Sequence, residues 1–388
     1  MKAAGRLAPS GGRPVPFAWL AIVHLKLRTT LAVSGISFAV LFMFMQLSFY
    51  GTVANTALAI SSRLDGDLVL ASPRFLHLNE TGTISSARLY QALAVPEVAS
   101  AIPLHIGRLT WRSLATDSRC SMAFIAVPTG DVTALRLPEV TRRLPDLRET
   151  NTVLIDRLSQ AKCAPFDVGA EAEVRGLRMK IVGQFDLGVG FLGDGAMIFS
   201  QETLSLLRGR PLTDHDLGLL KLRPGASREQ VAERLRQILP ADTRVLTTEE
   251  VDRLQTRHWV FDTAMGNMFA LGTLVGFFVG LVVLYQVLST DIRNQLPQYA
   301  TLKAMGYRDA RLYRFVLQQS WILGILGYLP SLALACAICM VARGLTRMPI
   351  FMTAERALVV LLLSLVMCTL SGLLSLRKVS SADPAELF

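Results

Sequence analysis

The sequence predicts an α-helical membrane protein with four spans and a large α/β (α+β) domain inserted between the first and second. Hydrophobic residues make up 51% of the chain, and four long stretches contain no acidic or basic side chain. They hold 34, 28, 28 and 20 residues, between Arg28 and Arg63, Asp262 and Asp291, Arg314 and Arg343, and Arg356 and Arg377. About 20 mostly apolar helical residues cross a bilayer, so each stretch is long enough.

These stretches divide the chain into nine segments. In order they are a cytoplasmic N-terminal segment (1–28), transmembrane helix 1 (29–60), an external α/β domain (61–262), transmembrane helix 2 (263–290), a cytoplasmic loop (291–314), transmembrane helix 3 (315–342), a short external loop (343–356), transmembrane helix 4 (357–376) and a cytoplasmic tail (377–388).

The distribution of charge predicts the orientation. Residues 63–257 carry 25 Lys and Arg against 24 Asp and Glu, whereas the rest of the chain carries 15 against 6. A basic excess beside apolar spans indicates cytoplasmic segments, and it argues against a nucleic-acid partner. Both termini are therefore expected in the cytoplasm. The loop with Arg343, Arg347 and Arg356 opposes this arrangement, but the parity of four spans outweighs it.

Two features admit alternatives. Ala57-Leu58-Ala59 resembles a signal-peptidase site, but the apolar stretch before it is far longer than the about 7 to 15 residues of a secretory signal, so we expect it to remain as an anchor. Cys120 and Cys163 lie in the external domain, where they would pair only if that compartment is oxidising. The sequence leaves this pairing open.

The external domain shows short β-branched runs that alternate with amphipathic segments. Strands are predicted at 67–71, 101–111, 122–127, 152–155, 179–185, 196–200, 217–221 and 243–246. Helices are predicted at 86–93, 202–207 and 228–238. Ser227 with Gln230, and Thr247 with Glu250, have the spacing of a capping box and mark helix starts.

Motifs of catalysis are absent or stand in the wrong context. Residues 188–193 match G-x-G-x-x-G, but a strand is predicted after them, so no helix N-terminus faces a phosphate. The five histidines, His24, His77, His105, His215 and His258, are scattered without metal-ligand spacing. No phosphate-binding lysine loop or serine elbow occurs. We therefore expect no enzymatic activity, no cofactor and no metal in this chain.

The cytoplasmic loop carries the most specific local signal. Pro297 suits the first turn of a helix and Gly306 suits a C-terminal cap, so residues 298–305 are predicted to form a short, isolated helix. Such a helix would present Tyr299, Leu302 and Met305 to a partner.

Glycines in the spans allow close helix packing. Gly272, Gly276 and Gly280 recur every four residues in the second span, where they would serve either a dimer seam or packing within one subunit. Gly327 and Pro330 would form a hinge in the third span, although membrane helices also tolerate both residues.

The loop sequence LPQYATLKAMGY, residues 296–307, resembles the cytoplasmic loop of DevC-type permeases, within the MacB/FtsX class of ABC proteins. Further similar stretches are LFMFMQ (41–46), DLVL (67–70), PIFMT (349–353) and SADPAELF (381–388). The arrangement of one span, an external domain and three spans is similar as well.

The resemblance implies a homodimeric permease in a bacterial inner membrane. It would work with a separate ATPase that binds the ATP, a periplasmic adaptor and a TolC-like outer-membrane duct, and it would export a glycolipid-like amphiphile. The residues implied to contact the ATPase are Pro297, Gln298, Tyr299, Leu302, Lys303, Met305 and Gly306. Gln298 stands where such loops often carry Glu. The alternative implied by the same class is an FtsX-like transmitter that regulates an external cell-wall hydrolase.

Overall fold

The computed structural model describes residues 26–130, 134–188, 190–304, 309–346 and 350–380. The chain divides into two compact units. The helical unit lies within Met1–Leu47, Leu271–Ala337 and Met352–Phe388, and the inserted domain lies within Ser48–Ala270 and Ile338–Phe351.

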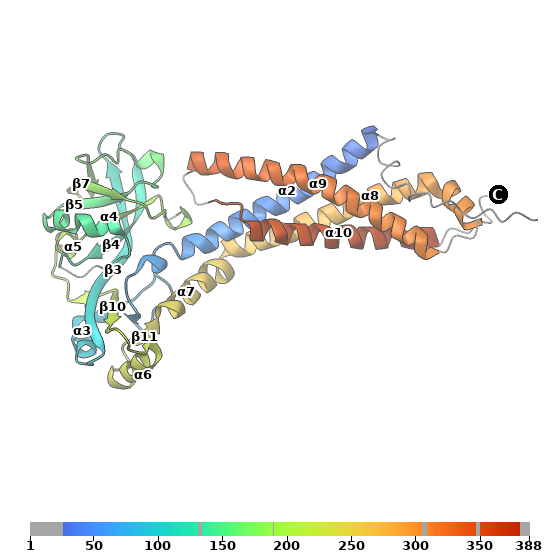
Figure 1. Ribbon diagram of the computed structural model, residues 1–388. Coiled ribbons are helices and arrows are strands. Elements are labelled where there is room, and N and C mark those ends of the chain that lie inside the picture. The colour runs from blue at the N-terminus through green and yellow to red at the C-terminus, as the bar shows by residue number, and fades with distance from the viewer. Residues whose placement is uncertain (1–25, 131–133, 189, 305–308, 347–349, 381–388) are drawn as a thin grey trace, which may run out of the picture. The chain divides into compact units, whose positions relative to one another are not determined.

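Four long helices dominate the described chain (Figure 1). They are α2 (Lys26–Ala57), α8 (Ala264–Ala304), α9 (Asp309–Thr346) and α10 (Ala354–Ser380). Each contains a segment that is long and apolar enough to cross a membrane. The α/β domain lies between α2 and α8 in the chain, so the predicted fold class is confirmed.

The helical unit has a core to which all four helices contribute. Phe44 of α2, Leu288 of α8, Leu323 of α9 and Met367 of α10 are among its buried members. Other positions on these helices, such as Phe278, are apolar and exposed. Helices that are apolar on every side are typical of membrane spans, because lipid covers what protein does not.

Helix α9 continues through Pro330 without a break. A methyl group at Gly327 would lie 2.7 Å from Cγ2 of Ile36, so this glycine allows α9 to approach α2 closely. The Ser37 hydroxyl donates to the Gly327 carbonyl at 3.1 Å, and the Ser331 hydroxyl lies 2.7 Å from the Ser37 carbonyl. Gly327, one of the two residues considered as a hinge, thus belongs to a packed contact between two helices, whereas Pro330 is exposed.

The inserted domain is built on a nine-stranded sheet with the order β11-β1-β10-β3-β4-β8-β5-β7-β6, together with a two-stranded sheet, β2-β9. The strands are β1 (Leu68–Ala71), β2 (Ile84–Ser85), β3 (Val98–Ser113), β4 (Arg119–Val127), β5 (Thr152–Asp156), β6 (Glu171–Val174), β7 (Leu177–Phe185), β8 (Gly195–Ser200), β9 (Asp214–His215), β10 (Leu217–Leu222) and β11 (Arg244–Thr247). The pairs β4–β8 and β5–β7 are parallel, and the other pairs are antiparallel.

Helices and short helical turns connect the strands. The α-helices are α3 (Ser86–Leu93), α4 (Pro138–Arg143), α5 (Gln201–Arg208), α6 (Arg228–Ile238) and α7 (Thr248–Thr256). The turns are η1 (Ser61–Arg63), η2 (Leu144–Arg148), η3 (Ala161–Cys163), η4 (Gly190–Leu192) and a π-helical turn, η5 (Arg257–Asp262). Helix α6 packs on β11, α4 on β7 and α5 on β8.

Strand β3 joins the two halves of the domain, because it pairs with β10 along its first half and with β4 along its second (Figure 1). Successive side chains of the strand point to opposite faces of the sheet, and in its second half one face is buried while Arg108 and Thr110 on the other face are exposed. Leu104 and Ile106 belong to one buried cluster, whereas Leu109 and Trp111 belong to another.

All eight predicted strands and the three predicted helices of this domain are present, with ends shifted by at most a few residues. Strands β2, β6 and β9 and helix α4 were not predicted, since two to six residues give too little pattern to detect. The capping box at Ser227 was wrong: the helix begins there, but the Ser227 side chain makes no cap bond. Its hydroxyl donates to Glu229 Oε2 at 3.1 Å instead.

The loop at 188–193 has the predicted surroundings. It contains the turn η4 and leads into strand β8. Gly188 and Gly190 adopt positive φ angles of 70° and 50°, which glycine tolerates without steric cost. In the described residues 190–200, a short turn followed by a strand stands where a nucleotide-binding loop would lead into an α-helix.

Candidate functional site

The segment predicted to meet a partner differs from the expectation in one respect. Helix α8 runs without interruption from Ala264 to Ala304, so Pro297 lies inside it. The prediction of a separate short helix was therefore wrong, although residues 298–304 are helical. A proline removes only one backbone hydrogen bond, which a long helix can accommodate. Met305 and Gly306 lie outside the described residues.

A polar contact ties α8 to α9 close to this segment. The side chain of Gln319 on α9 donates to Oδ2 of Asp291 on α8 at 3.1 Å, and Gln319 is 5% exposed. Ile292, Val316 and Tyr313 form a small apolar cluster at the same pair of helices. Asp291 and Gln319 lie 28 positions apart on two helices, so no local pattern in the sequence indicated this contact.

The three glycines of α8 face other helices of the same chain. A methyl group at Gly272 would lie 2.5 Å from Cδ of Gln46, and one at Gly276 would lie 3.0 Å from Cγ of Met43. At Gly280 it would overlap Sδ of Met367. The described packing therefore uses this glycine face within one subunit, against α2 and α10.

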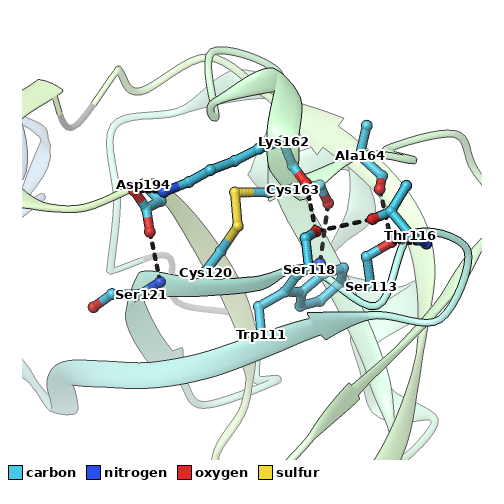
Figure 2. The surroundings of a disulfide bond; sticks show 10 residues. All are labelled: Trp111, Ser113, Thr116, Ser118, Cys120, Ser121, Lys162, Cys163, Ala164 and Asp194. Atoms are coloured by element: carbon cyan, nitrogen blue, oxygen red, sulfur yellow. Dashed lines mark hydrogen bonds and ion pairs between the residues drawn. A yellow bond between two sulfur atoms is a disulfide. The ribbon is translucent and has the colours of Figure 1, made fainter.

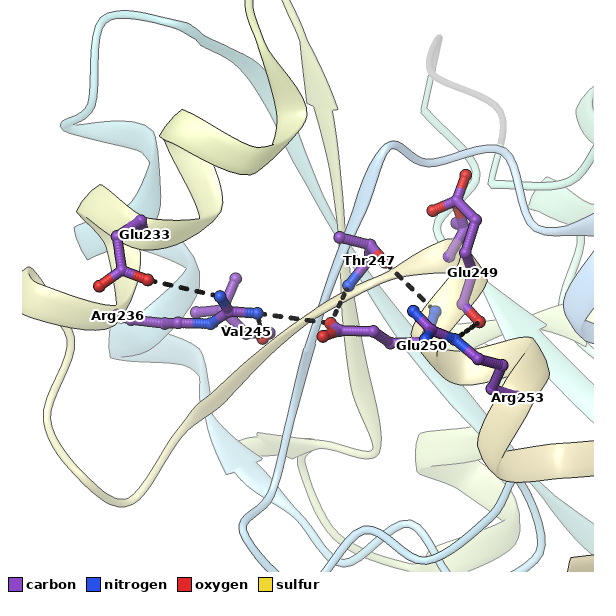
Figure 3. A network of polar contacts seen from close by, with 8 residues as sticks. Glu233, Arg236, Val245, Thr247, Glu249, Glu250 and Arg253 are labelled. Atoms are coloured by element: carbon purple, nitrogen blue, oxygen red, sulfur yellow. Dashed lines mark hydrogen bonds and ion pairs between the residues drawn. The ribbon is translucent and has the colours of Figure 1, made fainter. Parts of the chain in front are cut away.

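The inserted domain leads into α8 through α7 and η5. Helix α7 starts with the predicted capping box (Figure 3): Glu250 N–H donates to Thr247 Oγ1 at 3.2 Å, and Thr247 N–H donates to Glu250 Oε2 at 2.8 Å. After η5 the chain turns at Thr263. A methyl group at Gly266 would overlap the carbonyl of Val260, so this turn requires glycine.

The same polar network covers an edge of the large sheet. Strand β11 is an outermost strand, and Arg236 of α6 donates to its Val245 carbonyl at 3.1 Å (Figure 3). Arg236 also lies 3.4 Å from Glu250 Oε2. Edge strands whose carbonyls and N–H groups are occupied in this way resist pairing with another strand.

A disulfide bond joins Cys120 of β4 to Cys163 of η3 (Figure 2). Beside it, Trp111 Nε1 donates to the Cys163 carbonyl at 3.3 Å, and Lys162 pairs with Asp194 at 2.9 Å. Burial raises the pKa of Asp194, but Lys162 and the N–H of Ser121 outweigh it and lower that pKa below its usual value. The pairing that the sequence left open is thus formed in the structure.

Four histidines, which are far apart in the sequence, meet as two pairs. The rings of His77 and His258 are stacked, and Nε2 of His105 lies 3.2 Å from Nδ1 of His215. Spacing along the chain gave no signal of either pair, because each joins elements that only the fold brings together.

These features describe a protein with four helices long and apolar enough to cross a membrane and a disulfide-bonded α/β domain between the first two of them. Residues 29–238 match the model of the MacB-like periplasmic core domain, and residues 270–384 match that of the FtsX-like permease C-terminal region. The first match alone covers more than half of the chain. The protein therefore belongs to the MacB/FtsX-like family of ABC transporter permeases, as the resemblance of its loop implied.

An uncharacterized ABC transporter permease protein of Mycobacterium tuberculosis is 26% identical over 99 residues, which make up 26% of this chain and 11% of that relative. The chain thus matches only a small part of that longer protein.

Solved structures with similarity belong to related domains. The extracellular domain of the noncanonic ABC-type transporter YknZ from Gram-positive bacteria is similar with a TM-score of 0.35 at 12% identity. The match covers 47% of this chain and 100% of the YknZ domain. The periplasmic region of MacB from Actinobacillus actinomycetemcomitans is similar with a TM-score of 0.34 at 9% identity. The match covers 50% of this chain and 93% of the MacB region. A domain of a Porphyromonas gingivalis permease protein is similar with a TM-score of 0.32 at 14% identity. The match covers 46% of this chain and 85% of that domain.

Proposed function

We propose that this chain is the permease subunit of a DevC-type ABC exporter. The observation that carries this proposal is the match of two family models to two parts of one chain, a MacB-like core at 29–238 and an FtsX-like permease region at 270–384. The family implies a partner ATPase. We expect that ATPase to be a separate chain that binds the ATP. It would contact this permease through Pro297, Gln298, Tyr299, Leu302, Lys303, Met305 and Gly306.

The proposed orientation places the chain in a bacterial inner membrane with both termini in the cytoplasm and the inserted domain in the periplasm. The disulfide between Cys120 and Cys163 supports this orientation, because disulfides persist in oxidising compartments and are rare in the cytosol. The basic residues beside the spans support it independently.

Movement would pass from the ATPase to the inserted domain along the spans. Helix α8 supports this, since one helix extends from Ala264 next to the domain to Ala304 in the proposed ATPase-binding segment. We further propose that the permease is a homodimer, that a periplasmic adaptor and a TolC-like duct complete the path, and that the cargo is a glycolipid-like amphiphile.

The alternative is an FtsX-like transmitter that regulates an external cell-wall hydrolase. The FtsX-like match at 270–384 fits either role, whereas the MacB-like match at 29–238 favours export. A neighbouring gene for an adaptor protein would favour export, and one for a cell-wall hydrolase would favour signalling. Comparing the exported lipids of a deletion strain with those of its complemented parent separates the two roles.

The decisive experiment tests the ATPase contact. The permease is co-expressed with the neighbouring ATPase, purified in detergent, and assayed for association and ATP hydrolysis. Leu302→Asp and Met305→Asp should reduce association by at least about tenfold, since a buried charge costs more than 1.4 kcal/mol. Ala300→Asp adds the same charge two positions before Leu302 and serves as the control. Unchanged association and hydrolysis in both variants would overturn the proposal.

A further inference from the structure

Residues 72–81, between β1 and β2, form a compact loop that packs on α7 and η5. Within this loop, the N–H of Leu76 donates to the Glu80 carbonyl at 3.1 Å, and the N–H of Glu80 donates to the His77 carbonyl at 2.9 Å. The N–H of Leu78 donates a hydrogen bond to Oε1 of Gln255 on α7 at 3.3 Å. Gln255 is 1% exposed. The loop is therefore attached to α7 by a buried hydrogen bond.

Two histidines form the other attachment. The ring of His77 in the loop lies on the ring of His258 in η5, with centroids 3.8 Å apart and planes 17° from parallel. The indole of Trp259 meets both rings edge-on, at 5.9 Å and 5.3 Å. His77 is 5% exposed, so little water reaches this stack from the loop side.

A backbone hydrogen bond requires His77 to be neutral. The N–H of Asn79 donates to Nδ1 of His77 at 3.2 Å, so Nδ1 acts as the acceptor and the ring proton lies on Nε2. Protonating Nδ1 would remove this acceptor. It would also place a positive charge against the ring of His258.

Among the described residues, the titratable groups recorded as acting on His77 are His258 on η5 and Glu80 on its own loop. Burial, and then His258, lower the pKa of His77 below its ordinary value of 6.5. Glu80, whose Oε2 lies 3.9 Å from Nε2, opposes them without reversing the shift. Gln255, Asn79 and Trp259 complete the surroundings and carry no charge.

The stack lies directly before the second span. The carbonyl of His258 accepts the N–H of Thr263 at 3.0 Å, and the carbonyl of Trp259 accepts the Thr263 hydroxyl at 2.6 Å. The side chain of Asn267 donates to the carbonyl of Phe261 at 2.9 Å. The residues that hold the loop thus also form the turn from which α8 begins.

We propose that the stack of His77 on His258 forms an acid-sensitive latch, which holds loop 72–81 on the α7–η5 segment at neutral pH and releases it when His77 is protonated. The latch would regulate how tightly loop 72–81 of the inserted domain packs on α7 and η5, the segment that leads into α8. It requires only the contacts within this domain, so it stands independently of the exporter proposal.

The direction of the pH effect follows from the lowered pKa. His77 binds a proton more readily in the released loop than in the attached loop. Attachment is therefore fully favoured at pH values above 6.5, the ordinary pKa of histidine. It weakens as the pH falls below that value towards the lowered pKa. Glu80 lessens the effect, because its carboxylate partly stabilises the imidazolium.

The test is hydrogen–deuterium exchange of the full-length protein in detergent, at about pH 7.5 and about pH 5.5, on either side of the histidine range. After correction for intrinsic exchange rates, peptides covering Leu78 and Asn79 should exchange on the order of tenfold faster at the lower pH, as expected for each pKa unit of difference. Peptides from β4 should not change. Equal protection of the loop at both pH values would overturn the latch, and so would a parallel loss of protection in β4, which would indicate general acid unfolding.

Variants separate charge from packing. His258→Phe keeps an aromatic ring on His77 but removes the second imidazole, so the response to acid should become smaller than in the unmodified protein, with the loop still protected at neutral pH. Part of the response should remain, because burial is the larger cause of the lowered pKa of His77. His258→Gln serves as a second variant without a titrating group. Arg257→Gln changes an exposed charge in the same turn and should leave the response intact. A full response in both His258 variants would contradict the proposal.

Discussion

The helical unit and the inserted domain satisfy their polar groups in different ways. Between the described helices, polar contacts use neutral donors, such as the Ser371 hydroxyl on the Leu281 carbonyl at 2.9 Å and the Gln319 amide on the Asp291 carboxylate at 3.1 Å. The inserted domain uses charged pairs freely, such as Lys221 with Asp65 at 2.6 Å and Arg234 with Glu97 at 2.5 Å. Charge is costly within a bilayer but inexpensive at a wet surface, so the contrast follows from the solvent that each region faces.

The two units also achieve close packing by different means. The helices approach one another where a glycine removes a side chain, as at Gly276 and Gly327. The inserted domain instead interdigitates large side chains, such as Trp111 and Phe199 in one buried cluster and Leu104 and Ile198 in another, and adds a disulfide. The comparison predicts that a different kind of substitution lowers the stability of each unit.

The largest effect is expected in the inserted domain on removing the disulfide. Cys163→Ser should lower the free energy of unfolding by about 2 to 5 kcal/mol, because the open loop regains conformational freedom in the unfolded chain. Thermal unfolding of the full-length protein in detergent, with and without reductant, measures it. Cys336→Ala is the control, since that thiol is free. If reductant shifted the variant as much as the unmodified protein, the disulfide would not be the cause.

A smaller effect is expected in the helical unit from filling a glycine contact. Gly327→Ala should cost about 1 to 3 kcal/mol, because the new methyl group meets the branched carbon of Ile36 and backbone atoms of Ser37. Gly344→Ala on the same helix has no atom within 4 Å of the new methyl group and should be neutral or slightly stabilising. Equal thermal stability of the two variants would show that α2 and α9 do not approach closely here.

The smallest effect concerns the start of α7. Thr247→Ala removes the cap and should cost about 1 kcal/mol. Ser227→Ala is a matched control, because Ser227 occupies the same position in α6 without a cap bond. Thermal unfolding should therefore separate the two substitutions, and equal losses would contradict the assigned capping box.

The long patterns of the sequence were reliable guides. Charge-free stretches predicted the four membrane helices, since hydrocarbon excludes charge whatever the neighbours are. Strands such as β3 and β7 were predicted from β-branched runs. Short elements were not: β9 consists of Asp214 and His215 and exists only because it pairs with β2.

Local capping rules were less reliable than the elements they mark. Thr247 and Ser227 have the same spacing to an amide or carboxylate three residues later, yet only Thr247 forms the box. Glu250 carries out two tasks there, because Arg236 also binds it at 3.4 Å. Pro297 was expected to begin a new helix, whereas the existing helix continues through it.

The sequence by itself determined the membrane class, the position of the inserted domain and the family of this protein. Each of these follows from residues that are neighbours in the sequence. Only the tertiary structure decided that Cys120 bonds Cys163, that the α8 glycines face α2 and α10, and that His77 stacks on His258. Among these contacts, Met43 and Gly276 are 233 positions apart, and even Cys120 and Cys163 are separated by 43 positions. No local pattern encodes such pairs, since they depend on the summed packing of all the elements between them.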